Sequence, residues 1–256
     1  MAMTTEILDA GLTRQSKVAA YLYNAPEYLE TYYAAFKASL APVNTNYRYE
    51  TEELLYLFDN ADAEAIVFHA GFAPKLEAIK DRLTKVKCWI AVADEGAPIP
   101  AWATEYESIA APGADRVVPP QGRSGDDLLL LYTGGTTGMP KGVMWRQDDL
   151  FQVLGAGGNA ALGLLPVTSI PELIARHAAP GHTKPISIIA APLMHGTGAF
   201  NAMWNLVLAG SVDTLVGRHF DAVELLDTIQ RDRVNSISIV GDAFAKPILR
   251  ALDAEP

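Results

Sequence analysis

The sequence predicts an α/β fold with mostly parallel sheets and crossover helices. Short apolar runs rich in Val, Ile, Leu and Tyr alternate with longer segments whose apolar residues have helical spacing. Strands that alternate with helices in this way pair in parallel, because each helix crosses over the sheet. The 256 residues are 50% hydrophobic and 20% charged, a balance with which an ordinary globular protein buries a core.

Seven apolar runs have the composition of strands. They are residues 17–23, 65–69, 86–93, 127–133, 186–190, 212–216 and 236–240. Helices are expected between them over residues 26–40, 51–60 and 221–231, each with apolar residues on one face. Pro26 suits a first helical turn, and Thr51 is the expected N-cap of the second helix.

Two further segments bear on the domain organisation. Residues 110–125 are rich in Pro, Gly and Ala, and we interpret them as a surface loop within one compact unit. Residues 185–212 contain no Asp, Glu, Lys or Arg, but Pro192, His195 and Gly196 interrupt them. A helix that spans a bilayer needs about 20 mostly apolar residues in one run. We therefore expect a buried strand, a loop and a buried helix here, and no transmembrane segment.

Charge and cysteine content argue against several classes of function. The net charge of −10, with Lys and Arg scattered along the chain, makes nucleic acid a poor partner. Cys88 is the only cysteine, which rules out an internal disulfide and a cysteine-rich metal site. Acidic residues stand near the N-terminus where a signal peptide would be basic, so a cytoplasmic protein is expected.

Residues 132–142, which read YTGGTTGMPKG, form the most distinctive segment of the chain. They directly follow an apolar run and combine glycines, hydroxyls and one ammonium group. Residues with these features are Thr133, Gly134, Gly135, Thr136, Thr137, Gly138 and Lys141. Glycines let backbone amides approach an anion without a Cβ in the way, and threonine hydroxyls add donors. The segment therefore predicts a site for phosphate oxygens.

Other nucleotide loops fit this segment poorly. A Walker A loop requires a glycine, four further residues and then Gly-Lys-Ser/Thr, whereas Lys141 stands between Pro140 and Gly142. A dinucleotide fingerprint requires Gly-x-Gly-x-x-Gly after a strand, whereas residues 155–157 lie in a helical pattern. A Gly/Thr-rich turn that binds nothing remains an alternative.

A second motif, PLMHGTG at residues 192–198, follows a strand candidate and precedes an apolar helix. His195 either positions a substrate or is a satisfied core histidine. Gly196, Thr197 and Gly198 have little side-chain volume, which leaves room for a ligand or permits close helix packing.

The two motifs together resemble the AMP-forming (adenylate-forming) acyl-CoA synthetase superfamily. Its loop pattern is Thr-Ser-Gly-Ser/Thr-Thr-Gly-x-Pro-Lys-Gly, and only Gly134 departs from it, where serine is usual. Residues 192–195 are similar to its second core motif, Pro-Leu-x-His followed by small residues. Residues 18–24 and 41–44 also look like the family, so the resemblance covers nearly the whole chain.

The resemblance implies both a reaction and the residues that serve it. The reaction is ATP-dependent activation of a carboxylic acid, fatty or steroid-type, to acyl-AMP and then acyl-CoA. ATP and Mg²⁺ are the implied cofactors and coenzyme A the implied co-substrate. The glycine-loop residues would hold the ATP phosphates, with Thr136 at the Mg²⁺. His195 would position the substrate, and residues 196–198 would border the acyl chain.

The resemblance also implies that residues 1–256 are an incomplete N-terminal adenylation domain. Family members are far longer, and neither the later Tyr-Gly-x-Thr/Ser-Glu and Thr-Gly-Asp motifs nor the lysine-bearing C-terminal domain is found here. Lys246 lacks the matching context and is expected to be a surface lysine on a helix. We expect the chain alone to be inactive, and its oligomeric state stays open.

Three alternatives remain for the function. The first is a catalytically incomplete binding or scaffold module. The second is part of an acyl-AMP ligase that serves a carrier protein. The third alternative is an unrelated phosphotransferase, which would release ADP, whereas a ligase of the resembled type releases AMP.

Overall fold

The structure, a computed structural model, describes residues 2–110, 119, 122–135, 138–155, 163–181 and 184–254. The chain forms two compact units, where the sequence led us to expect one. The first consists of Met1–Tyr23 and Glu27–Asp148, and the second of Asn24–Pro26 and Asp149–Pro256. The border therefore falls at 148–149 and not in the Pro/Gly-rich segment 110–125. Each unit has its own sheet, and this is why the chain separates there.

The first unit contains a seven-stranded sheet in the order β5-β4-β3-β1-β2-β6-β7. Its strands are β1 Lys17–Tyr21, β2 Ala41–Asn44, β3 Ala63–His69, β4 Cys88–Val92, β5 Thr104–Glu105, β6 Leu128–Gly135 and β7 Gly138–Arg146. Neighbouring strands pair in parallel except β6 and β7, which pair in antiparallel. The predicted mostly parallel α/β fold is confirmed.

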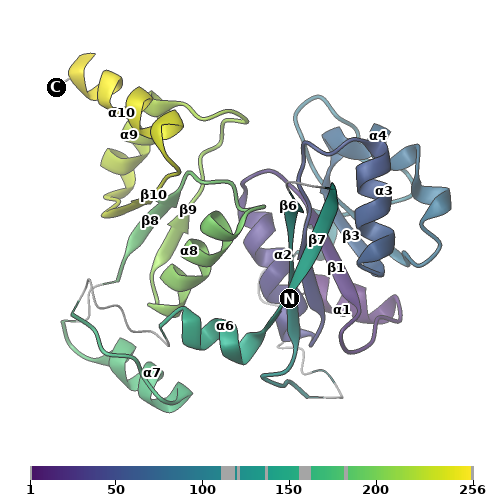
Figure 1. Ribbon diagram of the computed structural model, residues 1–256, viewed down its shortest axis with the longest axis horizontal. Coiled ribbons are helices and arrows are strands. Elements are labelled where there is room, and N and C mark those ends of the chain that lie inside the picture. Colours follow the sequence, from purple (N-terminus) through teal and green to yellow (C-terminus); the bar gives the residue numbers. More distant parts are fainter. Residues whose placement is uncertain are drawn as a thin grey trace. The chain divides into compact units, whose positions relative to one another are not determined.

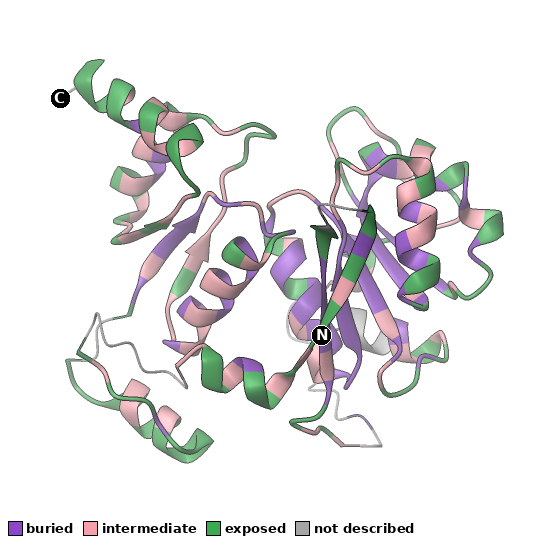
Figure 2. Ribbon diagram, in the orientation of Figure 1, coloured by how far each residue is buried: buried purple, intermediate pink, exposed green. Residues whose placement is uncertain are grey.

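Helices cover both faces of this sheet (Figure 1). They are α1 Ala2–Asp9, α2 Pro26–Lys37, α3 Thr51–Asn60, α4 Ala73–Glu77 and α5 Tyr106–Ile109, with 3-10 turns at Ala70–Phe72 and Lys80–Arg82. Leu54, Leu57 and Phe58 on α3 pack into one core with Tyr21 and Phe68 of the strands. The strands at the centre of the sheet are buried, as Figure 2 shows, and α3 packs against this buried layer.

The second unit contains a three-stranded parallel sheet in the order β10-β8-β9. Its strands are β8 Ile186–Ile189, β9 Ser211–Asp213 and β10 Ser236–Ser238, and its helices are α7 Ile170–Ala178, α8 Gly196–Val207, α9 Ala222–Asp232 and α10 Asp242–Ala254. Helix α6 (Gln147–Val153) contains the border between the units. Residues 185–212 thus form a strand, a loop and a helix, as expected. Across the described ranges, no helix is both long and apolar enough to cross a membrane.

Several element ends differ from the sequence prediction. The strand expected over 212–216 is β9, Ser211–Asp213, because its pairing with β8 ends at Asp213. The N-cap of α3 is Glu50 and not Thr51: the Glu50 N–H donates to the Glu53 carboxylate at 2.9 Å, in a reciprocal capping box. Helix α6 ends at Val153, and Gly155 has a φ of +80°, which an α-helix does not allow. The helical pattern expected over 155–157 is therefore wrong at Gly155, and residues 156–157 lie outside the described residues.

Candidate functional site

The glycine-rich segment forms the two arms of an antiparallel hairpin. Tyr132 is opposite Gly142, Thr133 is opposite Lys141, and Gly135 is opposite Gly138, with a register shift between Thr133 and Gly135. Of the predicted phosphate-site residues, Thr136 and Thr137 lie outside the described residues. The sequence predicted a loop here, whereas strands continue to Gly135 and resume at Gly138. A strand, β7, and not a helix follows the glycines, which agrees with the rejection of a Walker A loop.

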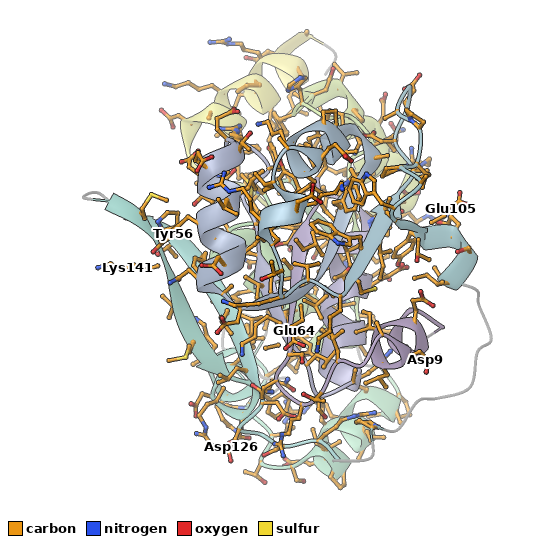
Figure 3. All side chains as sticks on the ribbon, turned by 90° about the vertical axis from the view of Figure 1, so that its right-hand side faces the viewer. Asp9, Tyr56, Glu64, Glu105, Asp126 and Lys141 are labelled. Atoms are coloured by element: carbon orange, nitrogen blue, oxygen red, sulfur yellow. The ribbon has the colours of Figure 1, made fainter. Side chains whose placement is uncertain are left out.

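Burial changes abruptly along this hairpin. Residues Leu129 to Tyr132 of β6 are buried, whereas Thr133, Gly134 and Lys141 are exposed. Figure 3 shows Lys141 pointing outward from the hairpin. A Cβ added at Gly134 would meet no atom within 4 Å, so the space beside that residue is open. The hairpin therefore has a buried root and exposed arms that carry a hydroxyl, unshielded amides and an ammonium group.

Contacts with β2 and α3 hold the root of the hairpin at Tyr132. The Asn44 side chain donates from Nδ2 to the Tyr132 carbonyl at 2.8 Å, and its Oδ1 accepts from the Tyr132 N–H at 2.5 Å. The Tyr132 hydroxyl donates to Oδ1 of Asn60 at 2.7 Å. Burial raises the pKa of Tyr132 to about 12, so this hydroxyl keeps its proton and remains a donor at neutral pH. No local pattern in the sequence indicates that Asn44 and Asn60 contact Tyr132.

An open pocket of about 470 Å³ lies beside the hairpin in the first unit. It is lined by Glu52, Leu55, Tyr56, Asp59, Arg82 and Met139. Met139 belongs to the hairpin arm, whereas Tyr56, labelled in Figure 3, comes from α3. The Arg82 guanidinium donates to the Glu52 carboxylate at 2.8 Å, so two of the lining charges are paired with each other.

The second motif lies in the other unit, at the start of α8. His195 is the N-cap residue of this helix, with extended backbone angles, and its side chain is exposed. Thr197 is exposed as well, Gly196 is half-buried, and Gly198 is buried. The alternative of a buried core histidine is therefore wrong for His195, because it begins a helix at the surface of its unit.

Asn24 holds the turn that leads to His195, a role that the sequence analysis missed. Its Nδ2 donates to the carbonyl oxygens of Ile189 and Ala191 at 3.2 and 3.1 Å, and its Oδ1 accepts from the Leu193 N–H at 2.8 Å. Three backbone groups between β8 and α8 are thus satisfied by one amide side chain. The separation of at least 165 residues hides such a contact from any local pattern.

Gly198 is small because the backbone packs against it. A Cβ at this position would lie 2.3 Å from the Pro192 carbonyl oxygen and 2.8 Å from that of Ala191. Both are backbone atoms, which cannot rotate away. Close packing therefore accounts for Gly198, whereas room for an acyl chain remains a proposal for Gly196 and Thr197.

We predict that Gly198→Ala destabilises the protein by about 1–3 kcal/mol, because an added methyl group forces the start of α8 away from Pro192. Thr197→Ala is the matched control, since that side chain is exposed and changes there usually stay within about 0.5 kcal/mol. Urea denaturation of the two variants measures the difference. Equal stability of both would contradict the packing explanation.

The donor groups of the hairpin suit an anion better than a metal ion bound by protein alone. The described ranges hold no group of three or more His, Cys, Asp or Glu residues that could bind a metal. Thr133, the amide of Gly134 and Lys141 instead offer hydrogen-bond donors and a positive charge to phosphate oxygens. Any metal that serves this site would then take most of its ligands from the phosphates and water.

A family model described as AMP-binding enzyme matches residues 5–255, nearly the whole chain. The chain belongs to the AMP-binding enzyme family. A medium-chain acyl-CoA ligase, Mig, of Mycobacterium avium is 39% identical over 242 residues, which are 93% of this chain and 43% of the ligase. A medium/long-chain-fatty-acid–CoA/3-oxocholest-4-en-26-oate–CoA ligase of Mycobacterium marinum is 34% identical over 251 residues, or 96% of this chain and 45% of that protein.

The fold of this AMP-binding family member recurs in a solved structure. An acyl-CoA synthetase from Brucella canis superposes with a TM-score of 0.73 at 20% identity, over 98% of this chain and 42% of that one. Together the matches confirm the family and the fold predicted from the two motifs. The chain spans less than half the length of these relatives.

Proposed function

We propose that this chain is the phosphate-binding and acyl-binding part of an enzyme that activates a carboxylic acid with ATP. The observation that carries the proposal is the glycine hairpin of a family member, with its buried root and its exposed arms. The names of the relatives favour a medium-chain or long-chain fatty acid, or a steroid side-chain acid, as the substrate. Residues 1–256 are then an incomplete adenylation domain, and the full-length protein supplies the remaining groups.

The proposed reaction brings two anions together. A carboxylate oxygen attacks the α-phosphorus of ATP, the bond to the bridging oxygen breaks, and pyrophosphate leaves with the electron pair. The thiol of coenzyme A then displaces AMP from the mixed anhydride and loses its proton. Because charge builds on phosphoryl oxygens, positioning and aimed donors contribute most to the rate.

The roles of individual residues follow from this chemistry. Thr133, Gly134, Gly135, Gly138 and Lys141, with Thr136 and Thr137 between them, hold the β- and γ-phosphates. Thr136 would help to hold the Mg²⁺ that accompanies ATP, and the metal would supply neutralisation of phosphate charge. His195 positions the carboxylate from the N-terminal end of α8, and Gly196 and Thr197 border the acyl chain.

Product analysis on the full-length protein tests the proposal. Protein, Mg²⁺ and ATP are incubated with octanoate, palmitate or a steroid side-chain acid, each with and without coenzyme A. We expect pyrophosphate only when an acid is present, and AMP and acyl-CoA only when the acid and coenzyme A are both present. Formation of ADP, or ATP consumption at the same rate with and without the acid, would contradict the proposal.

Two variants of the function give different outcomes in the same experiment. An acyl-AMP ligase that serves a carrier protein would release AMP only when a carrier with a phosphopantetheine thiol replaces coenzyme A. The second variant is a binding or scaffold module without catalysis. In that case the full-length protein would bind ATP without acid-dependent turnover.

A further inference from the structure

We infer that Tyr132 is the positioning residue that sets where the arms of the glycine hairpin stand, and that Asn44, Asn60 and Gly142 hold it in place. All four residues belong to the first unit. This role of Tyr132 rests on the proposed function, because it matters only if the arms bind nucleotide. Neither motif of the sequence analysis assigns a role to these side chains.

Asn44 extends the sheet where β2 ends. β2 has four residues and pairs with β6 at Val43 and Leu130. Beyond that pair, the side-chain amide of Asn44 makes two hydrogen bonds to Tyr132, in place of those that the β2 backbone would make if the strand continued. Asn44 is 2% and Tyr132 is 5% exposed, so without this amide the N–H and C=O of Tyr132 would lose these partners in a buried place.

The geometry of Tyr132 explains the glycine opposite it. The N–H and C=O of one strand residue point to the same edge, and both groups of Tyr132 point towards Asn44. Tyr132 and Gly142 therefore form a non-hydrogen-bonded antiparallel pair. In such pairs the two Cα atoms are about 4.5 Å apart, and the side chains lie closer together than in hydrogen-bonded pairs. A Cβ on Gly142 would lie 2.8 Å from Cε2 and 3.0 Å from Cζ of the Tyr132 ring.

The ring in turn reaches helix α3. Its hydroxyl donates to Asn60 at the end of that helix, 72 residues away along the chain. Tyr132 is thus fixed at its backbone by β2 and at its hydroxyl by α3, and its ring lies close to Gly142 of β7. β2, α3 and β7 therefore all contact Tyr132, which is the last buried residue before the exposed Thr133.

The arms begin one residue beyond this anchor. Thr133 and Lys141 form the next opposed pair, and both are exposed. A shift at Tyr132 and Gly142 therefore displaces Thr133 and Lys141 together. A misplacement of about 1 Å far from the reacting atoms can reduce a rate by about a hundredfold. A merely structural role for Tyr132 would instead lower stability and leave the affinity of the folded protein for ATP unchanged.

The test is a double-mutant cycle in the full-length protein with Gly142→Ala, Tyr132→Leu and their combination. Acid-dependent ATP–pyrophosphate exchange gives KM for ATP, KM for the acid and kcat, and calorimetry gives the Kd for MgATP. We expect each single change to raise KM and Kd for ATP about tenfold or more, with KM for the acid unchanged. The combination should match Tyr132→Leu, because the methyl group that Gly142→Ala adds meets no ring there.

Two further variants keep the result interpretable. Val143→Ala, at an exposed position next to Gly142 on β7, is the control and should leave KM for ATP within about twofold. Tyr132→Phe keeps the ring and removes only the hydrogen bond to Asn60. We therefore expect this variant to fold even if the larger changes prevent folding. It should raise KM for ATP about threefold. If the folded variants keep the wild-type KM and Kd for ATP, the positioning role is refuted while the proposed function stands. If the wild-type protein shows no exchange and no ATP binding, both fail.

Discussion

Replacement of Lys141 and Thr136 by alanine in the full-length protein is expected to lower acid-dependent ATP–pyrophosphate exchange by a factor of about a hundred to a thousand. Lys141 is the ammonium group on the exposed arm of the hairpin, and Thr136 is the hydroxyl that the resemblance places at the phosphates. Without both side chains, the negative charge that builds on the phosphoryl oxygens loses a positive charge and a hydrogen-bond donor. The exchange of radioactive pyrophosphate into ATP measures the loss.

Lys246→Ala provides the matched control for this prediction. Lys246 is an exposed lysine on α10 that pairs with Asp242 at 2.8 Å, which confirms the sequence expectation of a surface lysine on a helix. Its removal should leave exchange within about twofold, since exposed ion pairs contribute little. Exchange that survives the Lys141 and Thr136 changes at the wild-type rate would remove the basis for the ligase assignment.

Asp127→Ala is expected to lower the free energy of unfolding by about 2–4 kcal/mol. Asp127 is 1% exposed and directly precedes β6. Its carboxylate accepts from Arg14 Nε at 2.8 Å, from Gln15 Nε2 at 3.2 Å and from the Ser124 N–H at 3.0 Å. The change leaves three donors without their acceptor. Arg14 is 40% exposed, so its guanidinium can donate to water instead, which reduces the loss of stability.

Asp126→Ala tests the same charge change one residue away. Asp126 pairs with Arg146 at 2.6 Å, but both side chains are exposed, at 71% and 48%. Such a pair contributes less than about 1 kcal/mol. Urea denaturation followed by tryptophan fluorescence compares the two variants, and equal midpoints would contradict the role of burial at Asp127.

Much of the fold was predictable from local patterns. Strands that are buried on both faces are continuous apolar runs, so β1, β3, β4, β6 and β8 stand out in the sequence. β7 does not, because GMPKGVMWR contains two glycines and a proline, which usually mark turns. Its pairing with β6 overrides that preference. The border between the units was also missed, because it lies inside α6 and has no change of composition.

The chemistry of the site was easier to predict than the contacts that hold it. The glycine, threonine and lysine residues predict a phosphate site by their chemical types alone, and that site stays a prediction. Asn44 and Asn60 are ordinary asparagines until the fold brings them to Tyr132 across 88 and 72 residues. Gly142 was matched as part of a motif, and only its distance to the Tyr132 ring gives a physical reason for the glycine.

The final strand of the seven-stranded sheet also affects how this chain behaves in concentrated solution. β7 presents Met139, Val143 and Met144 at 43%, 44% and 70% exposure along the margin of the sheet. Such a margin is a template on which further copies can add, strand upon strand, into aggregates. Two residues of β7 disfavour this pairing. Pro140 has no N–H to donate to an added strand, and Lys141 would repel the Lys141 of a second copy. The lysine that we assign to nucleotide would therefore also help to keep the protein from self-association.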